Sequence, residues 1–207
     1  MNQKISLFYI HDPMCSWCYG FKPVLELLHK NLEHIMDIKY VLGGLAKDND
    51  QPMSDSMKKQ IKLNWKRIEE TIPNTKFNYN FWNLCVARRS TYPACRAVIA
   101  TSKQDSNLEK SMIKLIQQAY YLDAMNPSDY DVLYALSKKL KLDHNKFTYD
   151  IHSEEVHNEL MSQIQFCRDI GADSFPSLYI YADNNYYPIV LDYNNSNTVL
   201  EHIRSFI

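Results

Sequence analysis

The chain has 207 residues, enough for one domain with a large insertion or for two small domains, and 45% of them are apolar. Its 23 basic and 24 acidic residues give a formal net charge of −1, so no long-range field would recruit DNA or an anionic membrane. No run of 18 apolar residues occurs, and we therefore expect no transmembrane helix. Neither nucleic acid nor a membrane is an expected partner.

The N-terminus and the number of cysteines indicate the cellular compartment in which the protein is expected. The apolar stretch 5–10 is too short for the core of a signal peptide, and no small-residue cleavage site follows it. If Met1 is the native start, a cytoplasmic location is expected. Five cysteines, an odd number, argue against a secreted disulfide scaffold.

The first fifty residues predict a strand, a helix and a second strand. Residues 4–10 are typical of a buried strand, and residues 16–32 keep apolar side chains at helical spacing. Residues 38–42 predict the second strand, which ends at Gly43 and Gly44. In such a unit the two strands are parallel neighbours.

The middle of the chain, from about 51 to 151, shows helical patterns and hardly any strand. A polar helix is predicted from Pro52 to about Glu70, and another starts after Ser90 and Thr91, which suit a helix N-terminus. Two further apolar stripes cover 108–119 and 132–140. We therefore predict a helical insertion domain at 49–151, between two parts of one domain at 1–48 and 152–207.

The sheet pattern resumes after this insertion. A helix beginning near 156 ends at Gly171, a strand covers 177–181, and a turn leads into a second strand at 186–191. A last helix is predicted from about 196 to 206. The order is β-α-β, a helical insert, then α-β-β-α, which defines an α/β fold.

The pair Cys15 and Cys18 carries the chemistry. Two intervening residues on a first helical turn bring both sulfurs within disulfide reach. The helix start favours a thiolate at Cys15, which we expect to be the exposed nucleophile, while Cys18 is shielded and resolves the mixed disulfide. Half a zinc site is the alternative, but no further pair of ligands has a familiar spacing. We expect no metal, and with only four glycines no nucleotide cofactor.

Phe175-Pro176 precedes the late hairpin and supports the redox interpretation. A proline at the first position of a strand costs no ladder hydrogen bond, so an ordinary strand start is one explanation. A cis peptide beside the two cysteines is the other, and from these residues alone both stay open.

Taken together, several motifs resemble the DsbA family, in particular its branch without signal peptides described as predicted protein-disulfide isomerases. They cover nearly the whole chain: Asp12-Pro13-Met14-Cys15-Ser16-Trp17-Cys18-Tyr19-Gly20, Gly43-Gly44-Leu45, Arg89-Ser90-Thr91-Tyr92-Pro93-Ala94-Cys95-Arg96-Ala97, Gln118-Ala119-Tyr120-Tyr121 and Ser174-Phe175-Pro176-Ser177. The resemblance implies a thioredoxin-like fold interrupted by a helical domain that caps the site. It also implies that Pro176 is cis and that extended substrate binds beside it.

Two features depart from the family. Periplasmic oxidases usually carry Pro-His between the cysteines, where this chain has Ser16 and Trp17, so oxidising power does not carry over. Thioredoxin-like enzymes often have a buried acid six residues before the first cysteine, where this chain has Tyr9. Proton transfer at Cys18 must then use another group, for which His11, Asp12 and water are candidates.

Residues around the motif are candidates for auxiliary roles. His11 could stabilise the Cys15 thiolate as an imidazolium or simply bond to backbone at a strand end. Phe175, Pro176, Trp17 and Ser16 are candidate substrate contacts. Arg88 and Arg89 could attract a carboxylate or be solvated, and Cys85, Cys95 and Cys167 are expected to be structural.

Three functions compete. The favoured one is a thiol–disulfide oxidoreductase or isomerase acting on protein or small-molecule disulfides, with glutathione as a candidate co-substrate. The second is a glutathione-dependent transferase or isomerase, like the kappa-class transferases and 2-hydroxychromene-2-carboxylate isomerases, which typically have Ser at the position of Cys15. The third is a non-catalytic interaction module.

Overall fold

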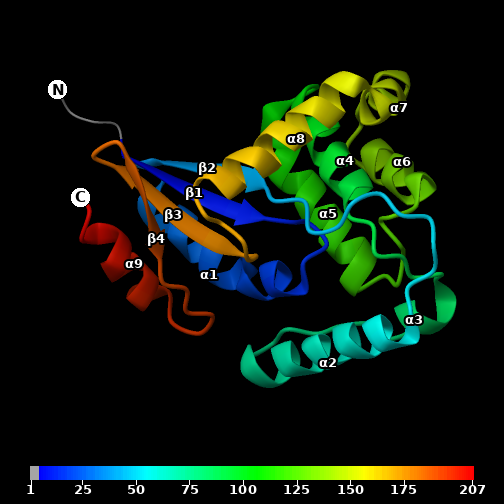
Figure 1. Cartoon of the computed structure of the whole chain (residues 1–207), viewed down its shortest axis with the longest axis horizontal. Helices are drawn as coiled ribbons and strands as arrows, with labels where there is room; N and C mark the ends of the chain where they lie inside the picture. Colours follow the sequence, from blue (N-terminus) through cyan, green and yellow to red (C-terminus); the bar gives the residue numbers. More distant parts are fainter. Residues whose placement is uncertain (1–4) are drawn as a thin grey trace.

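The computed structural model describes residues 5–207 and combines a four-stranded sheet with a group of helices beyond one end of it (Figure 1). The strands are β1 (Ser6–His11), β2 (Asp37–Leu42), β3 (Ser177–Ala182) and β4 (Asn185–Ile189), in the spatial order β2-β1-β3-β4. β1 pairs parallel to β2 and antiparallel to β3, and β3 pairs antiparallel to β4. The predicted order β-α-β, helices, α-β-β-α is confirmed.

Three helices cover the sheet. Helices α1 (Ser16–Leu32) and α9 (Ser196–Arg204) pack on one face, where alternate residues of β1 and β3 meet their apolar sides. Helix α8 (Glu154–Asp169) crosses the other face (Figure 1). Its first half packs in the core of the helical group, and its last turn brings Cys167 against the sheet. The predicted end at Gly171 agrees with its positive φ of 76°, which favours glycine.

The remaining helices lie between β2 and α8 in the chain. They are α2 (Asp55–Thr71), α3 (Phe81–Leu84), α4 (Tyr92–Ser102), the 3-10 turn η1 (Ser106–Leu108), α5 (Glu109–Tyr121), α6 (Tyr130–Lys139) and α7 (His144–His152). They share one apolar core, in which Trp65 of α2 is fully buried against aromatic rings of α3 and α5. The domain boundaries at 49 and 151 stay a prediction.

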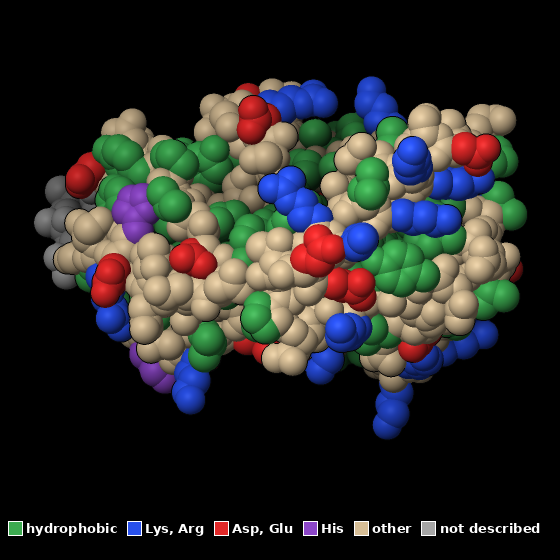
Figure 2. Space-filling model, turned by 90° about the horizontal axis from the view of Figure 1, so that it is seen from below, with side chains coloured by type: hydrophobic (Ala, Val, Ile, Leu, Met, Phe, Trp, Pro, Cys, Tyr) green, Lys and Arg blue, Asp and Glu red, His purple; other side chains and the backbone are tan. Residues whose placement is uncertain are grey.

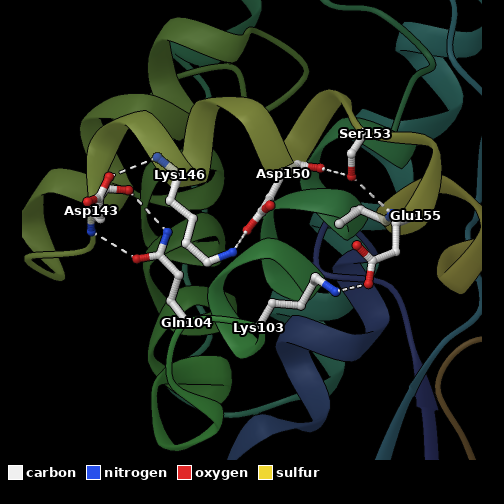
Figure 3. Close-up of polar contacts among 8 residues, drawn as sticks. Lys103, Gln104, Asp143, Lys146, Asp150, Ser153 and Glu155 are labelled. Carbon is white, nitrogen blue, oxygen red and sulfur yellow. Dashed lines mark hydrogen bonds and ion pairs between the residues drawn. The ribbon is translucent and has the colours of Figure 1, made fainter.

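Polar contacts hold α7 and α8 against α4 (Figure 3). Gln104, just after α4, exchanges two hydrogen bonds with the backbone of Asp143, the residue that caps α7. Lys103 forms an ion pair with Glu155 in the first turn of α8. Exposed ion pairs of this kind contribute little stability, so the buried apolar faces of these helices dominate the packing.

Some boundaries differ from the sequence prediction. α2 begins at Asp55 because the Ser54 hydroxyl accepts from the Met57 amide, while Pro52 lies in a bridge with Arg88. Thr91 does precede α4, but its hydroxyl donates to Asp12 and caps nothing. The first predicted strand included position 4, which lies outside the described residues. Within the described part of the chain, no helix is long and apolar enough to cross a membrane.

Candidate active site

Cys15 and Cys18 lie at the start of α1, as the motif predicts. Cys15 is the residue before the helix, with extended backbone, and Cys18 lies in its first turn. Both are free thiols, with 6% of Cys15 and 1% of Cys18 exposed. Cys18 is the more shielded thiol, but the expectation of an openly exposed Cys15 is wrong, because the neighbouring loops cover it.

The loop before β3 contacts the first cysteine. The Phe175–Pro176 peptide bond is cis, and the Cys15 thiol donates to the Phe175 carbonyl at 3.4 Å. The Phe175 ring packs directly on Gly43 at the end of β2, where a Cβ would overlap it. Three segments far apart in the sequence thus meet around Phe175.

A cavity of about 370 Å³ and a smaller one of about 230 Å³ reach the two thiols separately. Cys15 lines the smaller one, together with the predicted contacts Ser16, Trp17 and Phe175. Its far wall comes from the helical group and includes Arg89, a candidate from the sequence, and Trp65, which the sequence did not point to. The cleft over Cys15 therefore lies between the sheet-bearing part and the helical part.

The charged groups at this cleft differ in availability. Arg88 and Arg89 both line the cavity, but Arg88 is already paired with Asp129. The guanidinium of Arg67 lies 5.9 Å from the Trp17 ring, which also packs on Tyr193. On the face shown in Figure 2, basic and acidic side chains are interspersed with apolar ones.

Asp12 ties the active-site loop to the helical group. Its buried carboxylate accepts from the Met14 amide at 2.8 Å, the Leu45 amide at 2.7 Å, the Thr91 hydroxyl at 2.6 Å and the Cys95 thiol at 3.5 Å. Burial raises the pKa of Asp12, and these hydrogen bonds oppose the rise. Sequence reasoning named Asp12 only as a possible proton acceptor, although the signal for an Asx turn, Asp-Pro-Met before Cys15, was present.

His11 does not play the predicted charged role. It is fully buried, and neither ring nitrogen has a hydrogen-bond partner. Burial lowers its pKa to about 3, so the ring is neutral at pH 7 and supplies no positive charge to Cys15. The alternative of a backbone-bonded histidine also fails; instead, the ring stacks on Tyr9, with centroids 5.0 Å apart.

Cys18 is held as a neutral thiol. Its pKa lies well above the ordinary value because it is buried and because it hydrogen-bonds to Cys15. Among residues 5–207, no three His, Cys, Asp or Glu side chains converge to hold a metal ion. The arrangement offers two thiols of different accessibility that border separate cavities, which suits disulfide exchange.

Comparison with known proteins identifies the family. A family model described as Thioredoxin matches residues 8–199, and the chain belongs to this thioredoxin family. Its structure resembles a candidate protein disulfide isomerase from Nitrosomonas europaea, with 25% identity, a TM-score of 0.85, and 98% of this chain and 97% of that chain covered. The fold is thus that of a DsbA-family protein, in which a group of helices is inserted in the chain between the strands of the sheet.

Two further solved structures share the fold. The cytosolic disulfide reductase DsbM from Pseudomonas aeruginosa is 22% identical, with a TM-score of 0.77 and 97% of both chains covered, and has also been solved with GSH. A 2-hydroxychromene-2-carboxylate isomerase is 12% identical, with a TM-score of 0.64, and 96% of this chain and 93% of that chain are covered.

The curated relatives are named as adapter proteins, unlike the disulfide isomerase and reductase among the solved structures. The ClpXP adapter protein SpxH of Halalkalibacterium halodurans is 20% identical over 187 residues, which is 88% of this chain and 60% of the relative. The chain therefore spans about three fifths of the length of the curated relatives it matches.

Proposed function

We propose that the protein is a thiol–disulfide oxidoreductase in which Cys15 attacks a substrate disulfide and Cys18 resolves the mixed disulfide. A thiol–disulfide oxidoreductase in general is what the thioredoxin family and the DsbA-like neighbours support. The observation that carries the assignment of roles is the unequal placement of the thiols. Cys15 lines the cleft beside the Phe175 carbonyl, while Cys18 is buried one turn further into α1.

The substrate class follows from the cleft. A protein or small-molecule disulfide would approach Cys15 between Trp17 and Phe175, where an extended peptide could pair with exposed backbone. Glutathione is a reasonable co-substrate, because the fold neighbour DsbM has been solved with GSH. No metal or nucleotide is required, since the exchange needs only a thiol or disulfide donor. Five free thiols suit a reducing compartment, and we place the activity in the cytosol.

A pair of serine variants tests the roles. Cys18→Ser should stall at the mixed disulfide and retain its partner covalently until a reductant is added, because no second thiol can release it. Cys15→Ser should capture nothing, since a neutral hydroxyl does not open disulfides. Capture is read as a mass increase of the intact protein after incubation with oxidised glutathione or a disulfide-bonded model peptide.

The second candidate function is the glutathione-dependent isomerase or transferase, favoured by the fold match to 2-hydroxychromene-2-carboxylate isomerase. Cys15→Ser carries the hydroxyl typical of those enzymes, so under this alternative it would still turn over substrate while Cys18→Ser would trap nothing. That combination would refute the redox assignment. A Cys15 that reacts with no disulfide at neutral pH would instead favour a binding module, for which the SpxH relatives suggest a protein partner.

A further inference from the structure

The second thiol borders a different cavity from the first. Cys18 lines the larger space of about 370 Å³, whose walls come from α1, α5 and the strands β1 and β2. Cys15 is absent from its walls, and Cys18 is absent from those of the cleft over Cys15. Substrate that occupies the cleft over Cys15 therefore leaves this larger cavity open.

Tyr9 lies beside Cys18 in the wall of this cavity. It borders the same space as Cys18, only 3% of the residue is exposed, and its hydroxyl interacts with the Cys18 side chain. Burial raises the pKa of Tyr9 well above its ordinary value, so the hydroxyl stays protonated. A neutral hydroxyl donates one hydrogen bond and accepts others, so it can pass a proton on without becoming charged.

The mouth of the cavity holds a chain of polar groups. Lys110 Nζ lies 3.4 Å from His29 Nδ1, and His29 Nε2 lies 2.8 Å from the Tyr40 hydroxyl. Because an ammonium group only donates, Nδ1 must accept and Nε2 must carry the hydrogen given to Tyr40. The Tyr40 hydroxyl proton is then free to point into the cavity, where the Tyr40 ring meets that of Tyr9 at 5.2 Å.

Charged groups surround this chain from two helices. Lys22 and Glu26 come from α1, Glu33 follows its last residue, and Lys110 and Lys114 come from α5. Burial and the neighbouring Lys110 lower the pKa of His29, while Glu33 opposes the change. A neutral imidazole at the mouth can accept a proton at one nitrogen and release one at the other.

We propose that Cys18 exchanges its proton with solvent through the Tyr9 hydroxyl and the cavity behind it, on a route separate from the substrate cleft. This inference rests on the proposed function, in which Cys18 must act as nucleophile and leaving group. Tyr9 is the group in contact with the reacting sulfur; Tyr40 and His29 are positioning residues that order the cavity end of the route.

The step balances in atoms and electrons. In resolution, the Cys18 S–H bond breaks and the Cys15–Cys18 disulfide forms. The bond between Cys15 and the partner sulfur breaks, and its electron pair leaves as the partner thiolate. The Cys18 proton passes to the Tyr9 oxygen as the Tyr9 proton passes to cavity water, which leaves Tyr9 neutral. When an external thiol reduces the Cys15–Cys18 disulfide, a proton moves in the opposite direction, from cavity water through Tyr9, and protonates Cys18.

The test separates the two chemical steps with dithiobis(nitrobenzoic acid), an aromatic disulfide that releases one coloured thiolate per exchange. Attack by reduced Cys15 gives a first release whose rate depends on reagent concentration. Resolution by Cys18 gives a second release that is independent of it. A Cys85→Ser background removes the half-buried third thiol, which donates to the Ala124 carbonyl.

Tyr9→Phe keeps the ring stack and removes only the hydroxyl. We expect the first release to be unchanged and the second to slow by about tenfold, with its pH profile displaced upward by about one unit, the effect of losing one hydrogen bond to a developing thiolate. The matched control is Tyr179→Phe on β3, which loses a hydroxyl bonded to the Gly171 carbonyl on the other face of the sheet. It should match wild type in both phases.

The outcomes are distinguishable. A second release in Tyr9→Phe equal to that of Tyr179→Phe in rate and pH profile would overturn the proton route. A missing first release in the wild type would overturn the proposed function itself. If Tyr9→Phe does not fold, Tyr40→Phe serves in its place: a slowed second release supports the route, and an unchanged one refutes it.

Discussion

Replacing His11 should change how the stability of this protein depends on pH. His11 is fully buried at the end of β1, neither ring nitrogen has a hydrogen-bond partner, and burial lowers its pKa from 6.5 to about 3. Between pH 6.5 and about 3, the unfolded chain therefore binds a proton at His11 that the folded protein does not bind. His11 carries no penalty above pH 6.5, and stability is lost as the pH falls from there toward about 3.

The size of this effect follows from the linkage relation. One proton bound only by the unfolded state costs about 1.4 kcal/mol per pH unit. At about pH 4.5, some two units below the unfolded pKa, the loss is about 3 kcal/mol. Many domains are stable by only about 5–15 kcal/mol, so the effect is well within reach of measurement.

His11→Phe removes the titratable group and keeps an aromatic ring on Tyr9. Two unpaired nitrogens disappear and some volume is added, so near pH 7.5 the variant should lie within about 2 kcal/mol of wild type. By about pH 4.5 the variant should have gained about 3 kcal/mol relative to wild type. Urea unfolding of both proteins across this range measures the difference.

A matched control is His34→Asn, which removes an exposed imidazole beside Glu33 and should retain the wild-type pH dependence. A free-energy difference between wild type and His11→Phe that stays constant from pH 7.5 to 4.5 would refute the reasoning. The same variant also tests activation: because His11 is neutral, its loss should leave the rate of Cys15 attack unchanged.

Two other substitutions probe the surroundings of the site. Gly43→Ala should destabilise the fold by about 1–3 kcal/mol and slow Cys15 alkylation, because the added methyl group overlaps the Phe175 ring; an unchanged melting temperature and alkylation rate would contradict the close packing. Arg96→Lys should lower the free energy of unfolding by about 1–3 kcal/mol, because lysine cannot reproduce the two hydrogen bonds to Asp48 and the one to Tyr130. A loss below about 0.5 kcal/mol in chemical unfolding would show that these guanidinium hydrogen bonds are not needed.

The sequence predicts the long elements well because they have strong periodicity. Residues 16–32 form a helix with the predicted bounds, since their apolar stripe faces the sheet throughout. The short α3 and the nine-residue α7 were not predicted, because four residues carry no periodicity and α7 presents only Phe147 and Ile151 as buried apolar side chains. Their positions are set by contacts with α4 and α5 that lie far away in sequence.

The active site likewise combines a local motif, which the sequence predicts, with long-range contacts, which it does not. The spacing of Cys15 and Cys18 is local, so the motif alone locates them. The contact of Cys15 with the Phe175 carbonyl spans 160 residues, and that of Asp12 with the Thr91 hydroxyl spans 79. No local pattern specifies such contacts. The error about His11 has the same origin, since its neutrality depends on burial by the folded chain.

These long-range contacts show that the helical segment does more than cover the cleft. Two of the four donors to the buried Asp12 carboxylate, the Thr91 hydroxyl and the Cys95 thiol, come from the start of α4. The Tyr121 hydroxyl of α5 donates to the Met14 carbonyl, next to Cys15. Because a buried carboxylate without its donors is costly, the loop before α1 can keep this conformation only with the helices in place. The geometry of Cys15 is therefore a property of both parts of the chain, although the motif that contains it lies in one.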